Sequence, residues 1–124
     1  MAEPKEGLAT ERVGITNIGT GIVVDREPFR VSKKDDVGRL QVQWICDTSG
    51  FTVEFTHGSP FANPQDPANP KNPVFRSKGP GEAVLSGRVR ADVSYDGPDG
   101  LRKTYKYTVT IGERVIDPTG QVDP

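Results

Sequence analysis

His57 is the only histidine in the chain and the first candidate for catalytic chemistry. Histidine titrates near neutral pH, but a general base needs a nucleophile or a partner within reach. Ser59 and Asp47 would complete a triad with His57, yet the sequence has no nucleophile-elbow motif to support one. We therefore expect His57 to be an ordinary loop histidine and the protein not to be an enzyme.

Metal-binding side chains are equally sparse. Cys46 alternates in phase with Trp44, which predicts a small buried hydrophobic residue rather than a reactive thiol. Asp92, Asp96 and Asp99 offer carboxylates, but their spacing does not match a calcium-binding loop. The sequence predicts no metal site and no cofactor.

Charge and composition restrict the partners. The 124 residues carry a formal net charge of -1, so no basic field would attract nucleic acid or an anionic membrane. No apolar run approaches the roughly 20 residues that span a bilayer. The polar amino-terminal segment lacks the apolar centre of a signal peptide, and a single cysteine allows no intrachain disulfide. These features predict a cytoplasmic protein that binds neither nucleic acid nor membrane.

Alternation of apolar and polar residues predicts the elements that would position any site. Two strands at residues 39–46 and 51–56 are expected to form a hairpin around the turn at 47–50. Residues 88–95 and 104–111 are expected to form a second pair, which the glycine-rich turn after residue 95 would close.

Weaker strands are expected at residues 14–18, 21–25, 29–32 and 82–85, which gives about seven or eight in all. Helical periodicity is missing, and the 14 glycines and 11 prolines favour short strands joined by turns. We therefore predict an all-β fold, an antiparallel Greek-key sandwich or barrel, with an immunoglobulin-like strand order as one alternative.

The expected domain spans residues 13–118. A flexible amino-terminal segment, 1–12, would precede it, and a polar carboxy-terminal tail, 119–124, would follow it. A proline-rich loop at 57–75 interrupts the strand pattern. In that loop proline recurs at every third position from residue 64 to residue 73, which matches the three-residue turn of a polyproline II helix.

The proline-rich loop has two interpretations. The P-x-x-P spacing could present a ligand to a proline-reading partner. Alternatively, the loop is a stiff connection in which Asx-Pro turns fold it onto the domain, with Phe61 and Phe75 anchored in the core. For the first interpretation, the residues predicted to bind a partner are Phe61, Pro64, Pro67, Pro70 and Pro73.

Four stretches share a family pattern: QVQW (41–44), FTVEF (51–55) followed by SPF (59–61), SGRVRADVSY (86–95) and YKYTVTIGERVIDP (105–118). Their succession over residues 39–118 resembles the cupredoxin-like β-sandwich family. Copper-binding members carry one histidine upstream and a cysteine, a histidine and usually a methionine between the last two strands. Residues 96–104 hold none of these, so the resemblance implies a scaffold without the copper-ligand set.

These observations predict a non-catalytic protein-recognition or accessory domain, with the edge strands and the 57–75 loop as its binding surface. The partner would be a protein whose identity the sequence does not reveal. One alternative is a structural subunit of a homo-oligomer that pairs through edge strands. Another is a metal-binding or electron-transfer cupredoxin.

Overall fold

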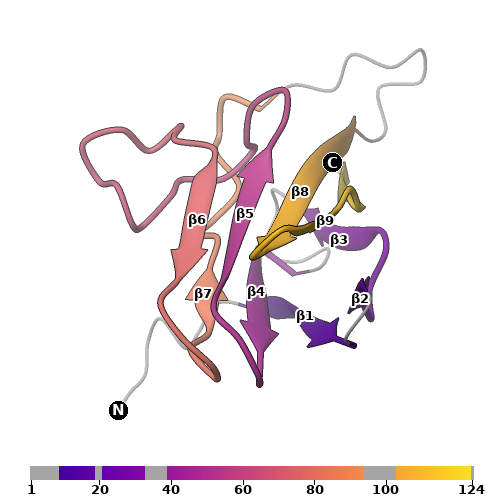
Figure 1. Cartoon of the computed structure of the whole chain (residues 1–124). Coiled ribbons are helices and arrows are strands. Elements are labelled where there is room, and N and C mark those ends of the chain that lie inside the picture. Colours follow the sequence, from indigo (N-terminus) through magenta and orange to yellow (C-terminus); the bar gives the residue numbers. More distant parts are fainter. Residues whose placement is uncertain (1–8, 19–20, 33–38, 94–102, 124) are drawn as a thin grey trace.

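The computed structural model describes residues 9–18, 21–32, 39–93 and 103–123, and every regular element in these residues is a β-strand (Figure 1). The all-β prediction is therefore confirmed for them. The strands are β1 (Thr10–Asn17), β2 (Ile22–Val24), β3 (Phe29–Ser32), β4 (Gln41–Cys46), β5 (Phe51–Phe55), β6 (Val74–Ser77), β7 (Val84–Leu85), β8 (Lys103–Ile111), β9 (Arg114–Ile116) and β10 (Thr119–Asp123).

The strands form two sheets. One has the order β2-β1-β4-β7, and the other has the order β3-β10-β8-β5-β6, with β9 also paired to β8. Both sheets are mixed, because β1 pairs with β4 in parallel and β10 pairs with β3 in parallel. The expectation of a wholly antiparallel arrangement is wrong for these two pairs. In each, the long stretch of chain between the partners lets the second strand run in the same direction as the first.

The predicted hairpin of residues 39–56 is also wrong. Both of its strands exist, but β4 lies in one sheet and β5 in the other, where β5 pairs with β6 and β8. Residues 47–50 therefore carry the chain across from one sheet to the other. Alternation identifies the face of a strand that points into the core, and both strands point their apolar faces into the same core from opposite sides.

Strand β8 confirms the strongest strand prediction and is the centre of its sheet, with partners β5, β9 and β10. Its expected partner at 88–95 forms only an isolated bridge, Val89 to Phe61, in the described residues, and the turn at 96–100 lies outside them. The weaker strand predictions are confirmed as β1, β2, β3 and β7. Strands β6, β9 and β10 had not been expected.

The predicted carboxy-terminal tail, 119–124, is replaced over residues 119–123 by β10, which lies between β3 and β8. Gly120 and Val122 of this strand are buried. The polar composition of the segment predicted a tail, whereas the structure has an interior strand. Residues 10–12, predicted to be flexible, belong to β1, while residues 1–8 lie outside the described residues.

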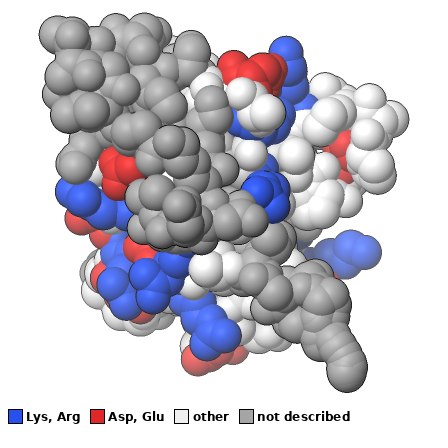
Figure 2. Space-filling view, turned by 180° about the vertical axis from the view of Figure 1, so that it is seen from behind, with Lys and Arg blue, Asp and Glu red and all other residues white. Residues whose placement is uncertain are grey.

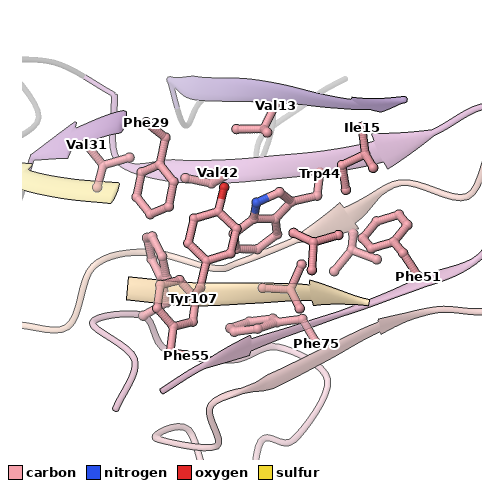
Figure 3. Close-up of a cluster of buried hydrophobic side chains, with 14 of the residues drawn as sticks. Val13, Ile15, Phe29, Val31, Val42, Trp44, Phe51, Phe55, Phe75 and Tyr107 are labelled. Carbon is pink, nitrogen blue, oxygen red and sulfur yellow. The ribbon is translucent and has the colours of Figure 1, made fainter. Parts of the chain in front are cut away.

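Six aromatic side chains from both sheets and the 57–75 loop fill the centre of the core, as Figure 3 shows in part. Their rings meet edge-on or tilted, with centroids 5.3 Å apart for Phe55 and Tyr107 and 5.4 Å apart for Trp44 and Phe75. Such geometry adds a specific attraction to the hydrophobic effect. The six residues are Phe29, Trp44, Phe55, Phe61, Phe75 and Tyr107.

The Tyr107 hydroxyl is buried among these rings. Among the described residues it has no hydrogen-bond partner, and neither has the indole nitrogen of Trp44, which lies beside it (Figure 3). Burial raises the pKa of Tyr107 above its ordinary value of 10.0, because the tyrosinate anion would lose its hydration.

We expect the free energy of unfolding to fall as pH rises above about 10, by about 1.4 kcal/mol per pH unit from this residue. Above that pH the unfolded chain releases the Tyr107 proton whereas the folded chain retains it, so alkali favours unfolding. Tyr107→Phe should remove this component. Urea unfolding between about pH 9 and pH 11 measures both proteins. Equal slopes for wild type and variant would contradict the assignment.

Gly120 sets the packing of β10 against β3. A Cβ atom at this position would overlap the ring of Phe29, its register partner. We expect Gly120→Ala to lower the free energy of unfolding by about 1–3 kcal/mol, the usual cost of overpacking. Gly79→Ala is the control, because a Cβ there meets nothing within 4 Å. Equal denaturation midpoints for the two variants would show that the close approach of Phe29 is not a constraint.

Candidate functional site

The predicted partner-binding loop is a chain of three turns. The N–H groups of Asp66, Asn69 and Asn72 donate to the carbonyl oxygens three residues earlier, at 3.3, 3.0 and 3.0 Å. In each turn an Asx residue stands first and a proline second, positions that both residues favour. A polyproline II helix has no internal hydrogen bonds, so that prediction is wrong, and the alternative of Asx-Pro turns is confirmed. We call residues 63–72 the proline-turn loop.

Asn63 holds the proline-turn loop together. Its side chain is only 1% exposed, and Nδ2 donates to the carbonyl oxygens of Asn72 at 3.0 Å and Val74 at 2.7 Å. Its Oδ1 accepts the N–H of Gln65 at 2.8 Å, and its backbone N–H donates to Pro70 at 2.9 Å. A buried amide with all these partners gives the loop a single conformation.

The loop also occupies the outer edge of β6. Gln65 bonds both backbone groups of Arg76: Oε1 accepts its N–H at 2.9 Å, and Nε2 donates to its carbonyl at 2.8 Å. The Val74 N–H donates to Asn72 Oδ1 at 3.0 Å, and the Val74 carbonyl accepts from Asn63. Val74 and Arg76 are the residues of β6 that direct backbone groups away from β5. Three amide side chains thus take the place of a neighbouring strand.

The predicted partner-binding residues divide into two groups. Phe61 is 0% exposed and packs against Phe55 at 5.8 Å between ring centroids, so it anchors the loop and is not on its surface. Phe75 is buried as well, and the predicted anchoring role of both phenylalanines is confirmed. Pro64, Pro67 and Pro70 are exposed, and Pro73 is half-buried. Binding of a partner by these prolines stays a prediction.

The catalytic triad considered for His57, Ser59 and Asp47 is not assembled. His57 and Ser59 follow β5, whereas Asp47 precedes it at the other end of the strand. Ser59 is buried, and its Oγ accepts the N–H of Phe61 at 3.1 Å. Cys46 is buried as predicted, with Sγ 3.7 Å from Thr48 Oγ1.

Two shallow hollows adjoin His57. One, of about 360 Å³, lies between His57 and the start of β8 and includes Tyr105 and Lys106. The other, of about 250 Å³, is lined by more polar side chains, among them Arg90 and Asp92. Ser59 lines the second hollow together with His57, and its Oγ accepts the backbone N–H of Phe61; no hydrogen bond joins the two side chains in the described residues.

The cations of the second hollow are already paired. The Arg90 guanidinium donates to the carbonyl oxygens of Ser59 at 2.6 Å and Phe61 at 3.2 Å, and it forms an ion pair with Asp92 at 2.5 Å. Lys71 Nζ lies 3.5 Å from the same carboxylate. Arg90 therefore joins the 59–61 segment to the 90–92 segment. Its guanidinium is engaged by groups of the protein itself and is not a free site for an anionic ligand.

Metal ligands do not gather in the part of the chain that the structure describes, where no group of three His, Cys, Asp or Glu could hold an ion. Asp96 and Asp99, two of the carboxylates considered above, lie outside it. Figure 2 shows positive and negative side chains interspersed on one face of the molecule. None of the described residues belongs to a helix that is long and apolar enough to cross a membrane.

The edge strand β3 is bonded on its outer side, like β6. The Arg30 N–H donates to Glu11 Oε2 at 3.3 Å, and the Ser32 N–H donates to the Arg39 carbonyl at 2.7 Å. Glu11 is buried, and Arg39 lies 3.6 Å from its other oxygen. Two edges of the larger sheet therefore have partners for their outward N–H groups.

The edge strand β2 differs. Val23 bonds towards β1, so Ile22 and Val24 direct their backbone groups outward, and these groups have no hydrogen-bond partner among the described residues. Strand β9 lies next to β2, and Figure 1 shows both on the side away from the proline-turn loop. We call this region, β2 and β9 with the neighbouring Ile18, the open side. It carries three of the four exposed large apolar side chains in the described residues: Ile18 (55% exposed), Val23 (48%) and Val115 (55%).

No protein-family model, no curated protein and no solved structure matches this chain. The resemblance to the cupredoxin-like family, and the copper-free scaffold that it implies, stay predictions.

The amide side chain of Asn63 should contribute strongly to stability. Asn63→Ala leaves the carbonyl oxygens of Val74 and Asn72 without a donor, and we expect it to lower the free energy of unfolding by about 2–3 kcal/mol. Asn69→Ala is the matched control, because Asn69 is exposed and only its backbone is hydrogen-bonded in the loop; it should cost less than about 0.5 kcal/mol. Urea unfolding followed by Trp44 fluorescence compares them. Equal losses would show that Asn63 does not hold the loop.

Proposed function

We propose that this protein is a non-catalytic recognition domain that binds an extended segment of another protein as an additional strand beside β2. One observation carries the proposal: the outward N–H groups of β3 and β6 have partners, whereas those of β2 have none in the described residues. Natural proteins cover or blunt the sheet edges that must not pair, so an edge left uncovered is a candidate for strand addition.

The apolar residues of the open side support this use of β2. Val23 faces outward from the sheet and is exposed next to the free backbone groups of Ile22 and Val24. Alternate side chains of an added strand would lie on the same face as Val23. The fitting partner is an extended segment with an apolar side chain at every second position. Hydrogen bonds to the backbone of β2 would hold this segment in register, and contact with the apolar side chains of the open side would give selectivity.

The absence of catalysis is the second part of the proposal. β5 separates His57 and Ser59 from Asp47, the Ser59 Oγ accepts a backbone N–H, and Arg90 and Lys71 of the second hollow are paired with Asp92. The proposal also retains the finer fold and setting expected from the sequence: a copper-free, cupredoxin-like Greek-key sandwich in the cytoplasm. Two sheets that share one aromatic core support the sandwich part of this description.

The same open edge favours a second candidate, a homo-oligomer in which β2 pairs with β2 of another copy. The exposed apolar side chains of the open side would suit a permanent interface equally well. Sedimentation mass separates the candidates, because recognition of a different protein requires no self-association of the free chain.

Val24→Pro should abolish strand addition without breaking the β1–β2 ladder. It removes an outward N–H, and proline is tolerated at such edge positions. We expect at least a tenfold loss of affinity for the partner captured from the native host, measured by calorimetry. Val24→Ala, which trims the side chain but keeps the N–H, is the control. Equal affinity of the two variants would contradict binding at β2, and a wild-type dimer that Val24→Pro converts to a monomer would identify the homo-oligomer.

A further inference from the structure

The outer edge of β6 is a complete pairing surface that the chain itself already occupies. Four backbone groups, the N–H and the carbonyl of Val74 and of Arg76, face away from β5, and every one of them is bonded by an amide side chain of the proline-turn loop. Without that cap, β6 would present the unpaired row of donors and acceptors that makes an edge strand associate.

We propose that the proline-turn loop is a built-in guard that keeps the protein monomeric at this edge, and that the surface beneath it pairs with β6 of a second copy when the guard is removed. This inference is independent of the binding proposed for β2. It concerns the opposite side of the molecule and a different set of hydrogen bonds (Figure 1).

The second copy is the occupant that the register of β6 fits. If two β6 strands met in antiparallel orientation about a two-fold axis, Val74 of each strand would lie opposite Arg76 of the other. Both residues direct their N–H and carbonyl groups outward, so each pair would exchange two hydrogen bonds. All four outward groups of each strand would then be satisfied, and the association would close as a dimer.

The proline-turn loop caps β6 and so ends the larger sheet. An ordinary strand in its place would itself present a new edge with unpaired backbone groups. It reaches β6 through the side chains of Asn63, Gln65 and Asn72, while the backbone N–H groups of residues 66, 69 and 72 are used in its turns. The exposed prolines at positions 64, 67 and 70 have no N–H to offer to a further chain. The prolines therefore hinder the proline-turn loop from pairing with a further strand, and its amide side chains occupy the outward backbone groups of β6.

Gln65 is the member of the guard that can be removed separately. Its side chain is exposed and bonds only to Arg76, whereas Asn63 is buried and holds the turns together. A hollow of about 480 Å³ adjoins Gln65 and Arg76, so the surface next to this contact is open to an approaching strand. Loss of the Gln65 side chain should expose Arg76, and loss of the Asn72 side chain as well should release the Val74 N–H, while Asn63 keeps the loop in place.

The test uses full-length protein that carries Val24→Pro, so that association through β2 cannot be mistaken for association through β6. Sedimentation equilibrium of this background should give the monomer mass. Adding Gln65→Ala and Asn72→Ala together, which frees both outward groups of Arg76 and the N–H of Val74, should raise the average mass towards that of a dimer as concentration increases. Adding Asn69→Ala instead, at an exposed loop residue whose side chain does not contact β6, should leave the mass unchanged.

Val74→Pro supplies the reversal. Combined with Gln65→Ala and Asn72→Ala, it removes the outward N–H that would donate to the Arg76 carbonyl of a second β6, and the mass should return to that of the monomer. Near-ultraviolet circular dichroism of Trp44 verifies the fold of each variant. If Gln65→Ala does not fold, Gln65→Glu replaces it, because a carboxylate still accepts the Arg76 N–H but cannot donate to its carbonyl. A folded variant that stays monomeric, or an association that Val74→Pro does not reverse, would overturn the proposal.

Discussion

A backbone N–H or carbonyl group at the edge of a sheet must be bonded by the protein, bonded by a partner or left in water. This constraint organises the molecule. At the two opposite edges of the larger sheet, three amide side chains bond the outward groups of β6, and Glu11 and the Arg39 carbonyl bond the outward N–H groups of β3. On the open side, β2 keeps its outward groups unbonded within the described residues. These edge strands differ in how far their outward backbone groups are already hydrogen-bonded, and the functional proposal follows from that difference.

The guarded edge depends on the core. Phe61 and Phe75 flank the proline-turn loop, and both are buried in the aromatic cluster, so the two ends of the loop are held where its amides reach β6. Gly87 lets the neighbouring segment approach: its φ is +78°, and a Cβ there would collide with the carbonyl of Ala62. Glycine is the residue that tolerates both conditions. Packing of the core, a close backbone approach and the edge contacts therefore form one connected arrangement.

Much of this could be predicted from sequence, but not the arrangement between elements. Alternation identified β4, β5 and β8 because their apolar faces point into one core. It could not show that residues 47–50 cross between sheets, since a hairpin and a crossing show the same alternation. Strand β10 was not predicted, because Gly120 contributes no apolar side chain to the pattern although it packs against Phe29. The proline repeat was ambiguous, because a polyproline helix and a chain of shared turns both have a period of three. The Asx residue before each proline was the signal for turns, whereas nothing near Gln65 indicated its contact with Arg76.

Amide hydrogen exchange of the unmodified protein, read residue by residue by NMR, tests the central claim most directly. The account predicts that the N–H groups of Val74 and Arg76 exchange slowly, because side-chain amides bond them, although they lie on an edge strand. It predicts that the N–H groups of Ile22 and Val24 exchange much faster, because no hydrogen bond within the described residues holds them. Equal exchange at the two edges, or slower exchange at β2 than at β6 in the free monomer, would contradict the claim that one edge is guarded and the other is open.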